Sequence, residues 1–162
     1  MASPLPEEII IHPPATGMAA ICEPILRSAP DWFGIEKSIV SYVEVIKNMP
    51  TVLAMRGDQA VGFMTIEQHF PLSAELHVLC VRPEWHRKGI GKALLDASEA
   101  HLRRIGTRFL QVKTLSPRQA CERYERTRHW YEAMGFTPLT EFLTLWDKDN
   151  PCLQLIKVLD ES

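Results

Sequence analysis

Apolar residues recur along the chain with two periods, and the change from one to the other predicts where helices and strands lie. Helical spacing of apolar positions is found at residues 15–29, 36–49, 89–105 and 120–134. Alternating or β-branched segments predict strands at residues 7–12, within 51–70, and at 74–81, 107–115, 136–146 and 152–159. The resulting order, β-α-α-β-β-β-α-β-α-β-β, predicts a mixed sheet with helices packed against it, of the α/β or α+β class.

Proline and glycine positions refine the predicted boundaries. Pro13 and Pro14 are expected to stop the first strand, and Pro24 can kink or break the first helix. Gly57 and Asp58 predict a hairpin turn between the second and third strands.

The strand at residues 74–81 and the helix at residues 89–105 carry most of the functional argument. Alternation along the strand places Leu76, Val78 and Cys80 on one face. The opposite face then carries Glu75, His77, Leu79 and Val81. The apolar stripe expected along the helix consists of Ile90, Leu94, Ala97, His101 and Ile105.

Length and charge narrow the class of protein. The 162 residues fit one domain, 1–162. The formal net charge is -2, which argues against nucleic acid as a partner because such proteins usually carry a basic excess. No apolar run approaches the ~20 residues of a membrane span, and the N-terminus lacks the pattern of a signal peptide. We therefore expect a cytoplasmic protein with no membrane partner.

The cysteines are scattered and form no CxxC pair. They are Cys22, Cys80, Cys121 and Cys152. This spacing gives no support to a zinc site, so no metal is expected. Free and mostly buried thiols are the expected state in a reducing compartment.

The segment "VRPEWHRKGIGKALL", residues 81–95, places two glycines and several basic residues at the start of a helix. Helix N-termini leave backbone N–H groups without partners and carry partial positive charge. Glycine lets a ligand approach because no Cβ intrudes. Gly89 and Gly91 therefore indicate an anion site, with charge added at its rim by Arg87, Lys88 and Lys92. A solvated basic turn is the alternative.

Two common phosphate motifs fit this segment badly. A dinucleotide-binding fingerprint needs a third glycine where Leu94 stands, directly after a strand. A P-loop needs Ser or Thr after the Gly-Lys pair, but Ala93 follows Gly91 and Lys92.

The segment resembles the GNAT superfamily of acyl-CoA-dependent N-acetyltransferases. The family's pyrophosphate-binding signature is Gln or Arg, two residues, Gly, one residue, then Gly or Ala. "HRKGIG" matches both glycines after the lead-in "VRPEWH", although His86 stands where the family has Arg or Gln. A second family feature is an aromatic residue and a glycine near the C-terminus, and "WYEAMGF", residues 130–136, matches it. The order of elements from His12 to Val158 also resembles this fold.

The resemblance implies a mixed, mostly antiparallel sheet of about six or seven strands, flanked by about four helices and splayed at the strand before the glycine loop. It also implies acetyl-CoA as the acyl donor. The residues implied in binding it are Leu79, Cys80, Val81, His86, Arg87, Lys88, Gly89, Ile90, Gly91 and Lys92.

The implied reaction is direct attack of an amine on the thioester in a ternary complex. An alkylammonium, with a pKa near ~10.4, must first lose a proton. Glu75 is the first candidate for the base, with Glu67 and His77 as alternatives. Tyr131 matches a family tyrosine beside the CoA sulfur and is the candidate donor to the thiolate, while simple core packing is its alternative role. Tyr124 is the alternative donor.

Trp32 and Phe33, in the predicted turn at residues 30–36, are the candidate wall of the acceptor site; a hydrophobic anchor under the turn is the alternative. We expect a small-molecule amine as acceptor. A protein acetyltransferase acting on Lys or an N-terminus, and a catalytically silent CoA-binding regulatory module, are the alternatives. The apolar C-terminal strands are consistent with a homodimer.

Overall fold

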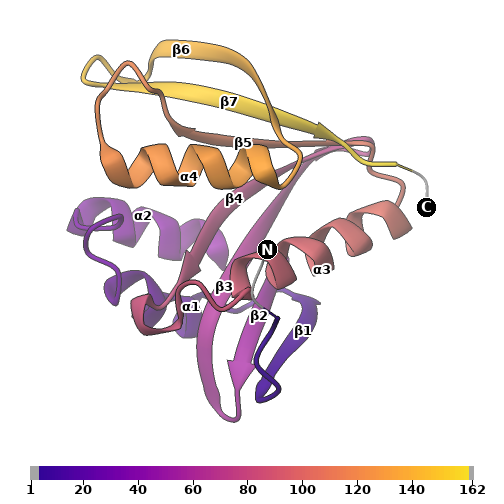
Figure 1. Ribbon diagram of the computed structural model, residues 1–162. Coiled ribbons are helices and arrows are strands. Elements are labelled where there is room, and N and C mark those ends of the chain that lie inside the picture. The colour runs from indigo at the N-terminus through magenta and orange to yellow at the C-terminus, as the bar shows by residue number, and fades with distance from the viewer. Residues whose placement is uncertain (1–3, 161–162) are drawn as a thin grey trace. The chain divides into compact units, whose positions relative to one another are not determined.

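The structure, a computed structural model, describes residues 4–160 (Figure 1). Its helices are α1 (Ala19–Arg27), α2 (Glu36–Ile46), α3 (Ile90–Arg104) and α4 (Glu122–Ala133), with a short 3-10 helix at Pro83–Trp85. Its strands are β1 (Ile9–Ala15), β2 (Thr51–Arg56), β3 (Gln59–Phe70), β4 (Ser73–Val81), β5 (Phe109–Leu115), β6 (Thr137–Asp147) and β7 (Asn150–Val158). This order of strands and helices is the predicted one. Residues 1–3 and 161–162 of the expected domain lie outside the described part.

The strands form a seven-stranded sheet in the order β1-β2-β3-β4-β5-β7-β6. The pairs β1–β2, β2–β3, β5–β7 and β6–β7 are antiparallel. The described residues thus form a mixed α/β structure with seven strands and four α-helices, as expected. The chain divides into two compact units, one of residues up to 67 together with 76–105, the other of residues 68–75 together with 106 onward.

The core of the first unit is formed by α1 and α2 with residues of β2, β3 and β4. Its buried members include Cys22, Ile25, Leu26, Ile46, Leu53, Phe63, Val78 and Cys80. Burying a Leu, Ile or Phe side chain contributes roughly 1.5–3 kcal/mol each, so this cluster fixes the two helices on the strands.

Neighbouring residues of β3 show that α3 covers the other face of these strands. Phe63 belongs to the core shared with α1. Met64 Sδ instead accepts a hydrogen bond from Ser98 of α3 at 3.3 Å. Because successive side chains of a strand point to opposite faces, α1 and α3 lie on opposite sides of β3 (Figure 1). Helix α3 is thereby held against these strands.

The second unit is built around β5 and β7. Leu110 and Val112 of β5 are buried, as is Leu155 of β7, which pairs with Val112. Helix α4 packs against β5. The buried Arg128 of α4 donates a hydrogen bond to the Leu115 carbonyl at 2.8 Å, which fixes α4 at the end of β5.

The expected end of the first strand at Pro13 and Pro14 is wrong. Strand β1 continues to Ala15, which pairs with Thr51 after an irregularity in register that follows His12. β1 is an edge strand. An edge tolerates prolines because their missing N–H groups cost no ladder hydrogen bond on the open side. Pro24 likewise lies inside α1 without ending it.

The expected apolar stripe of the helix after the glycines is only partly correct. Ile90 and Leu94 are buried, but Ile105 follows the end of α3 and is 53% exposed. The other buried residues of α3 are Leu95, Ser98, Glu99 and Leu102. The buried face of α3 is therefore displaced by about one residue from the predicted stripe. Ser98 and Glu99 are buried although they are polar, so the apolar pattern alone did not identify this face.

Among the described residues, no helix has the length and apolar character needed to cross a membrane.

Candidate active site

A turn with two left-handed residues connects β4 to α3. After β4 ends at Val81, the chain forms the short 3-10 helix, and Arg87 and Gly89 then adopt φ values of 62° and 78°. Left-handed backbone is unstrained for glycine but costs energy for an arginine. The surrounding contacts must therefore hold the turn in this form.

Backbone N–H groups at the start of α3 remain available for a ligand. The first helical hydrogen bond runs from the Ala93 N–H to the Gly89 carbonyl at 3.1 Å. Helix geometry therefore leaves the N–H groups of Ile90, Gly91 and Lys92 without an intrahelical acceptor. Residues alternating between right- and left-handed backbone form concave N–H clusters that bind anions. The arrangement fits a phosphate or pyrophosphate group.

Three side-chain contacts connect the turn to its surroundings. His86 Nε2 lies 2.8 Å from the Val81 carbonyl oxygen, closing the turn back onto β4. Arg82 Nε donates to the Ala60 carbonyl of β3 at 3.0 Å. Lys88 lies over the Trp85 ring at 5.6 Å from its centroid. The turn is therefore tied to β3, β4 and its own aromatic residue.

The three basic residues predicted beside the anion site, Arg87, Lys88 and Lys92, differ in their surroundings. Arg87 and Lys88 are exposed next to the turn. Lys92, in contrast, forms an ion pair with Asp96 one helical turn later, at 2.7 Å, and this hydrogen bond raises the pKa of Lys92. Arg87 and Lys88 are thus the better placed to add charge beside an anion.

Gly62 of β3 borders the candidate site and was not identified from the sequence. A Cβ at this position would lie 3.1 Å from Val81 Cγ2 and 3.3 Å from Ile90 Cγ2. The missing side chain lets the end of β4 and the first residue of α3 approach β3 closely. A glycine inside an apolar strand pattern was the available signal.

Leu79, Cys80 and Val81 form the end of β4. Cys80 is buried and its thiol contacts the Ile25 carbonyl at 3.6 Å, while Leu79 and Val81 are half-buried. Burial raises the pKa of Cys80 to about 12. Cys80 is thus buried on the apolar face that the alternation predicts, and any contribution of Cys80 to a ligand would come from its backbone.

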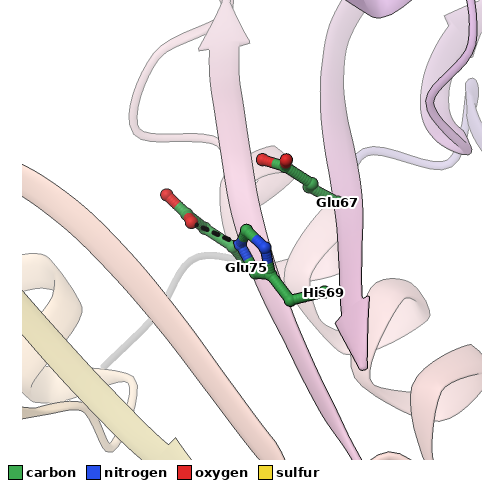
Figure 2. A group of neighbouring side chains, drawn as sticks. All are labelled: Glu67, His69 and Glu75. Atoms are coloured by element: carbon green, nitrogen blue, oxygen red, sulfur yellow. Dashed lines mark hydrogen bonds and ion pairs between the residues drawn. The ribbon is translucent and has the colours of Figure 1, made fainter. Parts of the chain in front are cut away.

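Glu75 is buried and held by two side chains of the second unit. Its Oε1 lies 2.8 Å from His69 Nε2 (Figure 2) and 3.0 Å from Lys113 Nζ, and Lys113 also reaches Oε2 at 3.1 Å. Lys113 therefore compensates the charge of a carboxylate that is only 6% exposed. His69 lies on β3 and Glu75 on β4. The sequence did not indicate this contact, because it depends on how the two strands pair.

The alternative bases lie in the first unit and contact each other. His77 Nδ1 is 3.7 Å from Glu67 Oε2. The His77 ring also meets the Tyr42 ring edge-on, with centroids 5.9 Å apart. Both side chains are partly exposed, so both are accessible to a ligand.

Tyr131 is buried in α4 between two other aromatic rings. Its ring centroid lies 5.3 Å from that of Trp130 and 5.6 Å from that of Phe136. Burial raises the pKa of the phenol, with a smaller contribution from Tyr124. Tyr131 therefore combines core packing with a phenol that keeps its proton, as a proton donor requires.

Trp32 and Phe33 lie in the segment between α1 and α2, partly buried against the core of the first unit. Phe33 meets the Tyr42 ring at 5.8 Å. Trp32 instead meets the His86 ring at 5.6 Å. The structure thus brings a predicted acceptor residue, Trp32, next to a predicted cofactor residue, whereas Glu75 and Tyr131 belong to the other unit.

Comparison with known proteins identifies the family. Residues 48–138 match the acetyltransferase (GNAT) domain, which is more than half of the chain. The chain belongs to the GNAT acetyltransferase family, as its motifs indicated. A GNAT-family structure from Desulfovibrio desulfuricans shares the fold with a TM-score of 0.80 at 17% identity, covering 94% of this chain and 99% of that one.

Two further similar proteins have described activities. An aminoglycoside 6'-N-acetyltransferase structure complexed with coenzyme A has a TM-score of 0.73 and 21% identity, covering 93% of this chain and 97% of that one. Mycothiol acetyltransferase from Propionibacterium freudenreichii subsp. shermanii is 29% identical over 133 residues, which is 78% of this chain. The matched part spans only 36% of that relative's length.

Proposed function

We propose that this protein transfers an acetyl group from acetyl-CoA to the amino group of a small molecule. The observation that carries the proposal is the turn at the start of α3, with left-handed Arg87 and Gly89 followed by helical N–H groups that have no intrahelical acceptor. Family membership supports it, as does the coenzyme A in the similar aminoglycoside acetyltransferase.

The turn would hold the pyrophosphate of CoA. The N–H groups of Ile90, Gly91 and Lys92 donate hydrogen bonds to its oxygens, and the helix dipole adds to the attraction. Arg87 and Lys88 supply positive charge from the exposed side. Acetyl-CoA supplies the thioester whose carbonyl the amine attacks. A backbone N–H in the Leu79–Val81 stretch would hydrogen-bond to that carbonyl oxygen as charge develops on it.

Four side chains are candidates for moving protons. Glu75 accepts the proton of the acceptor ammonium at Oε2, which has one hydrogen-bond partner where Oε1 has two. Glu67 and His77 remain the alternative bases. Tyr131 donates its phenolic proton to the departing thiolate; its raised pKa keeps the phenol protonated until then. Trp32 and Phe33 would form the wall beside the acceptor.

A small-molecule acceptor is supported by two of the similar proteins, whose names specify mycothiol and aminoglycosides. In the aromatic pair Phe33–Tyr42, the Tyr42 ring meets His77, which contacts the acidic Glu67. This combination suits an amine with an apolar body. An acetyltransferase acting on Lys or an N-terminus would use the same cofactor turn, so the acceptor screen must include peptides.

The test is acetyl transfer by the purified chain from acetyl-CoA to a panel of amino sugars, aminoglycosides, polyamines and peptides, read by mass spectrometry of the products. We expect acetylation of at least one small amine. Glu75→Gln should then lower kcat by about 10²- to 10⁴-fold with the Kd of CoA unchanged. If Glu75→Gln retains kcat and Glu67→Gln does not, Glu67 is the base.

Other outcomes separate the alternatives. Acetylation of peptides alone would identify a protein acetyltransferase. CoA binding without turnover of any amine, unaffected by Glu75→Gln or Tyr131→Phe, would identify a CoA-binding regulatory module. Absence of CoA binding would refute the proposal as a whole.

A further inference from the structure

His86 connects the cofactor turn to the segment between α1 and α2. On one side, its Nε2 lies 2.8 Å from the Val81 carbonyl oxygen at the end of β4. On the other, its ring meets the Trp32 ring with centroids 5.6 Å apart and an angle of 77°. Both contacts lie within the first unit. A single side chain thus spans two segments far apart in the sequence.

The contact with Val81 fixes the orientation of the His86 ring. A carbonyl oxygen only accepts hydrogen bonds, so Nε2 must carry the proton. The ring then has one donor engaged and is held at a defined angle above the turn. A T-shaped aromatic pair depends on this angle, because the edge of one ring must face the π-electrons of the other.

Trp32 is itself held by its surroundings. Its backbone N–H donates to the Ala29 carbonyl at 3.1 Å, and its side chain packs against the buried core of the first unit. His86 is exposed and follows the 3-10 helix, which has no buried residue. The better anchored of the two rings is therefore Trp32, and the support runs from Trp32 to His86.

We infer that Trp32, acting through His86, is a positioning residue for the cofactor turn. Trp32 orients the His86 ring, and His86 in turn holds the turn closed on Val81. The closed turn keeps Arg87 in the left-handed conformation that aims the N–H groups at the start of α3. This inference rests on the proposed function, since it assigns Trp32 a part in CoA affinity.

A consequence is that the acceptor and CoA stabilise each other. Trp32 belongs to the candidate acceptor wall, so an acceptor that packs on it restricts the Trp32 ring and with it His86. Coupling between two binding sites is reciprocal. CoA should then bind more tightly with acceptor present, and the acceptor more tightly with CoA present, by the same factor.

The test is a double-mutant cycle on the Kd of CoA alone, measured by calorimetry without acceptor. We expect Trp32→Ala and His86→Ala each to weaken CoA binding by about three- to tenfold, the range that an aromatic pair supports. The double variant should be no weaker than His86→Ala, because the two residues act through one contact. Trp32→Phe, which keeps an aromatic ring, should restore most of the affinity.

Phe33→Ala is the matched control. Phe33 is the next residue of the same segment and packs on the same core, but its ring contact is with Tyr42. It should leave the Kd of CoA unchanged. Trp32→Leu serves if Trp32→Ala folds poorly, because leucine keeps apolar volume and removes the aromatic contact; thermal unfolding monitors the fold.

The outcomes separate this inference from the proposed function. If the wild-type chain does not bind CoA, the proposed function fails. If it binds CoA and Trp32→Ala or Trp32→Leu leaves the Kd unchanged, the positioning role is wrong and the proposed function stands. Equal weakening by Phe33→Ala, or additive effects in the double variant, would also overturn the inference, since loosening of the whole segment would then explain the loss.

Discussion

The carboxylate of Glu75 shows how a single residue can differ from its sequence-based interpretation. On alternation alone, Glu75 belongs to the more exposed face of β4 with His77 and Leu79. In the structure it is buried and paired with Lys113 of β5. A buried carboxylate without a cation would be costly. The stability of this pair can therefore be measured separately from any catalytic role.

Lys113→Met should lower the free energy of unfolding by about 3–5 kcal/mol at pH 7, because it leaves the buried Glu75 carboxylate without its cation. Adding Glu75→Gln should recover part of the loss. Urea denaturation followed by circular dichroism measures both. Lys47→Met is the control, since Lys47 pairs with Glu44 on the exposed surface and its loss should cost no more than about 1 kcal/mol. Equal effects of the two lysine variants would contradict the assignment.

The cysteines offer a second residue-scale prediction. Burial raises the pKa of both Cys22 and Cys80 to about 12, so about one thiol in ten thousand is ionised at pH 8 at each site. Cys152 is buried with a raised pKa, and Cys121 is partly exposed. A disulfide reagent such as DTNB should therefore modify Cys121 first in the folded protein, because the thiolate is the reactive form.

All four thiols should react after denaturation. Cys121→Ser should remove the fast phase of the reaction with the folded protein. A fast phase that persists in this variant would show that a second thiol is accessible.

At the scale of elements, the proposed function depends on how the end of β4, the turn and the start of α3 fit together. The turn is determined locally by Gly89 and by the helix that begins directly after it. Its position is determined by β3, because Gly62 lets Val81 and Ile90 approach. A side chain at Gly62 therefore tests whether the turn needs that approach.

Gly62→Val should weaken CoA binding by at least about tenfold and lower stability by roughly 1–3 kcal/mol, since overpacking pushes Ile90 and Val81 away from β3. Calorimetry with CoA and thermal unfolding measure the two effects. Ile46→Val, a buried change on α2, costs about 0.5–1.5 kcal/mol and should leave the Kd of CoA unchanged. CoA binding by Gly62→Val with wild-type affinity would show that the close approach serves packing only.

At the scale of the whole molecule, β6 stands out as an edge strand with apolar side chains in solvent. Leu139, Leu143, Leu145 and Trp146 are each about half exposed. The strand also loses regular pairing with β7 between Phe142 and Asp147. Exposed edges with apolar residues favour association with another chain, which supports the homodimer expected from the C-terminal strands.

We expect the chain to self-associate through β6 at micromolar concentrations or above. Light scattering after size-exclusion chromatography should show a mass approaching twice that of one chain as concentration rises. The double change Leu143→Glu and Leu145→Glu should return the protein to a monomer, because it places charges on the exposed edge. A constant monomer mass for the wild-type chain would refute this prediction.

The sequence by itself determined the order of the elements, the mixed sheet and the glycine turn before α3. These follow from local rules: apolar period specifies helix or strand, and glycine at a helix N-terminus specifies the turn. The errors at Pro13, Pro14 and Ile105 also have a physical cause. Local patterns do not reveal which strand lies at an edge or which helix face is covered.

Only the tertiary structure decided which side chains meet. Glu75 with Lys113, Gly62 with Ile90, and His86 with Trp32 are each separated by many residues in the chain. Such contacts depend on strand register and helix packing, since a shift of one residue turns a side chain to the opposite face. The residue types that carry the chemistry are therefore present in the sequence, but the fold decides which of them support one another.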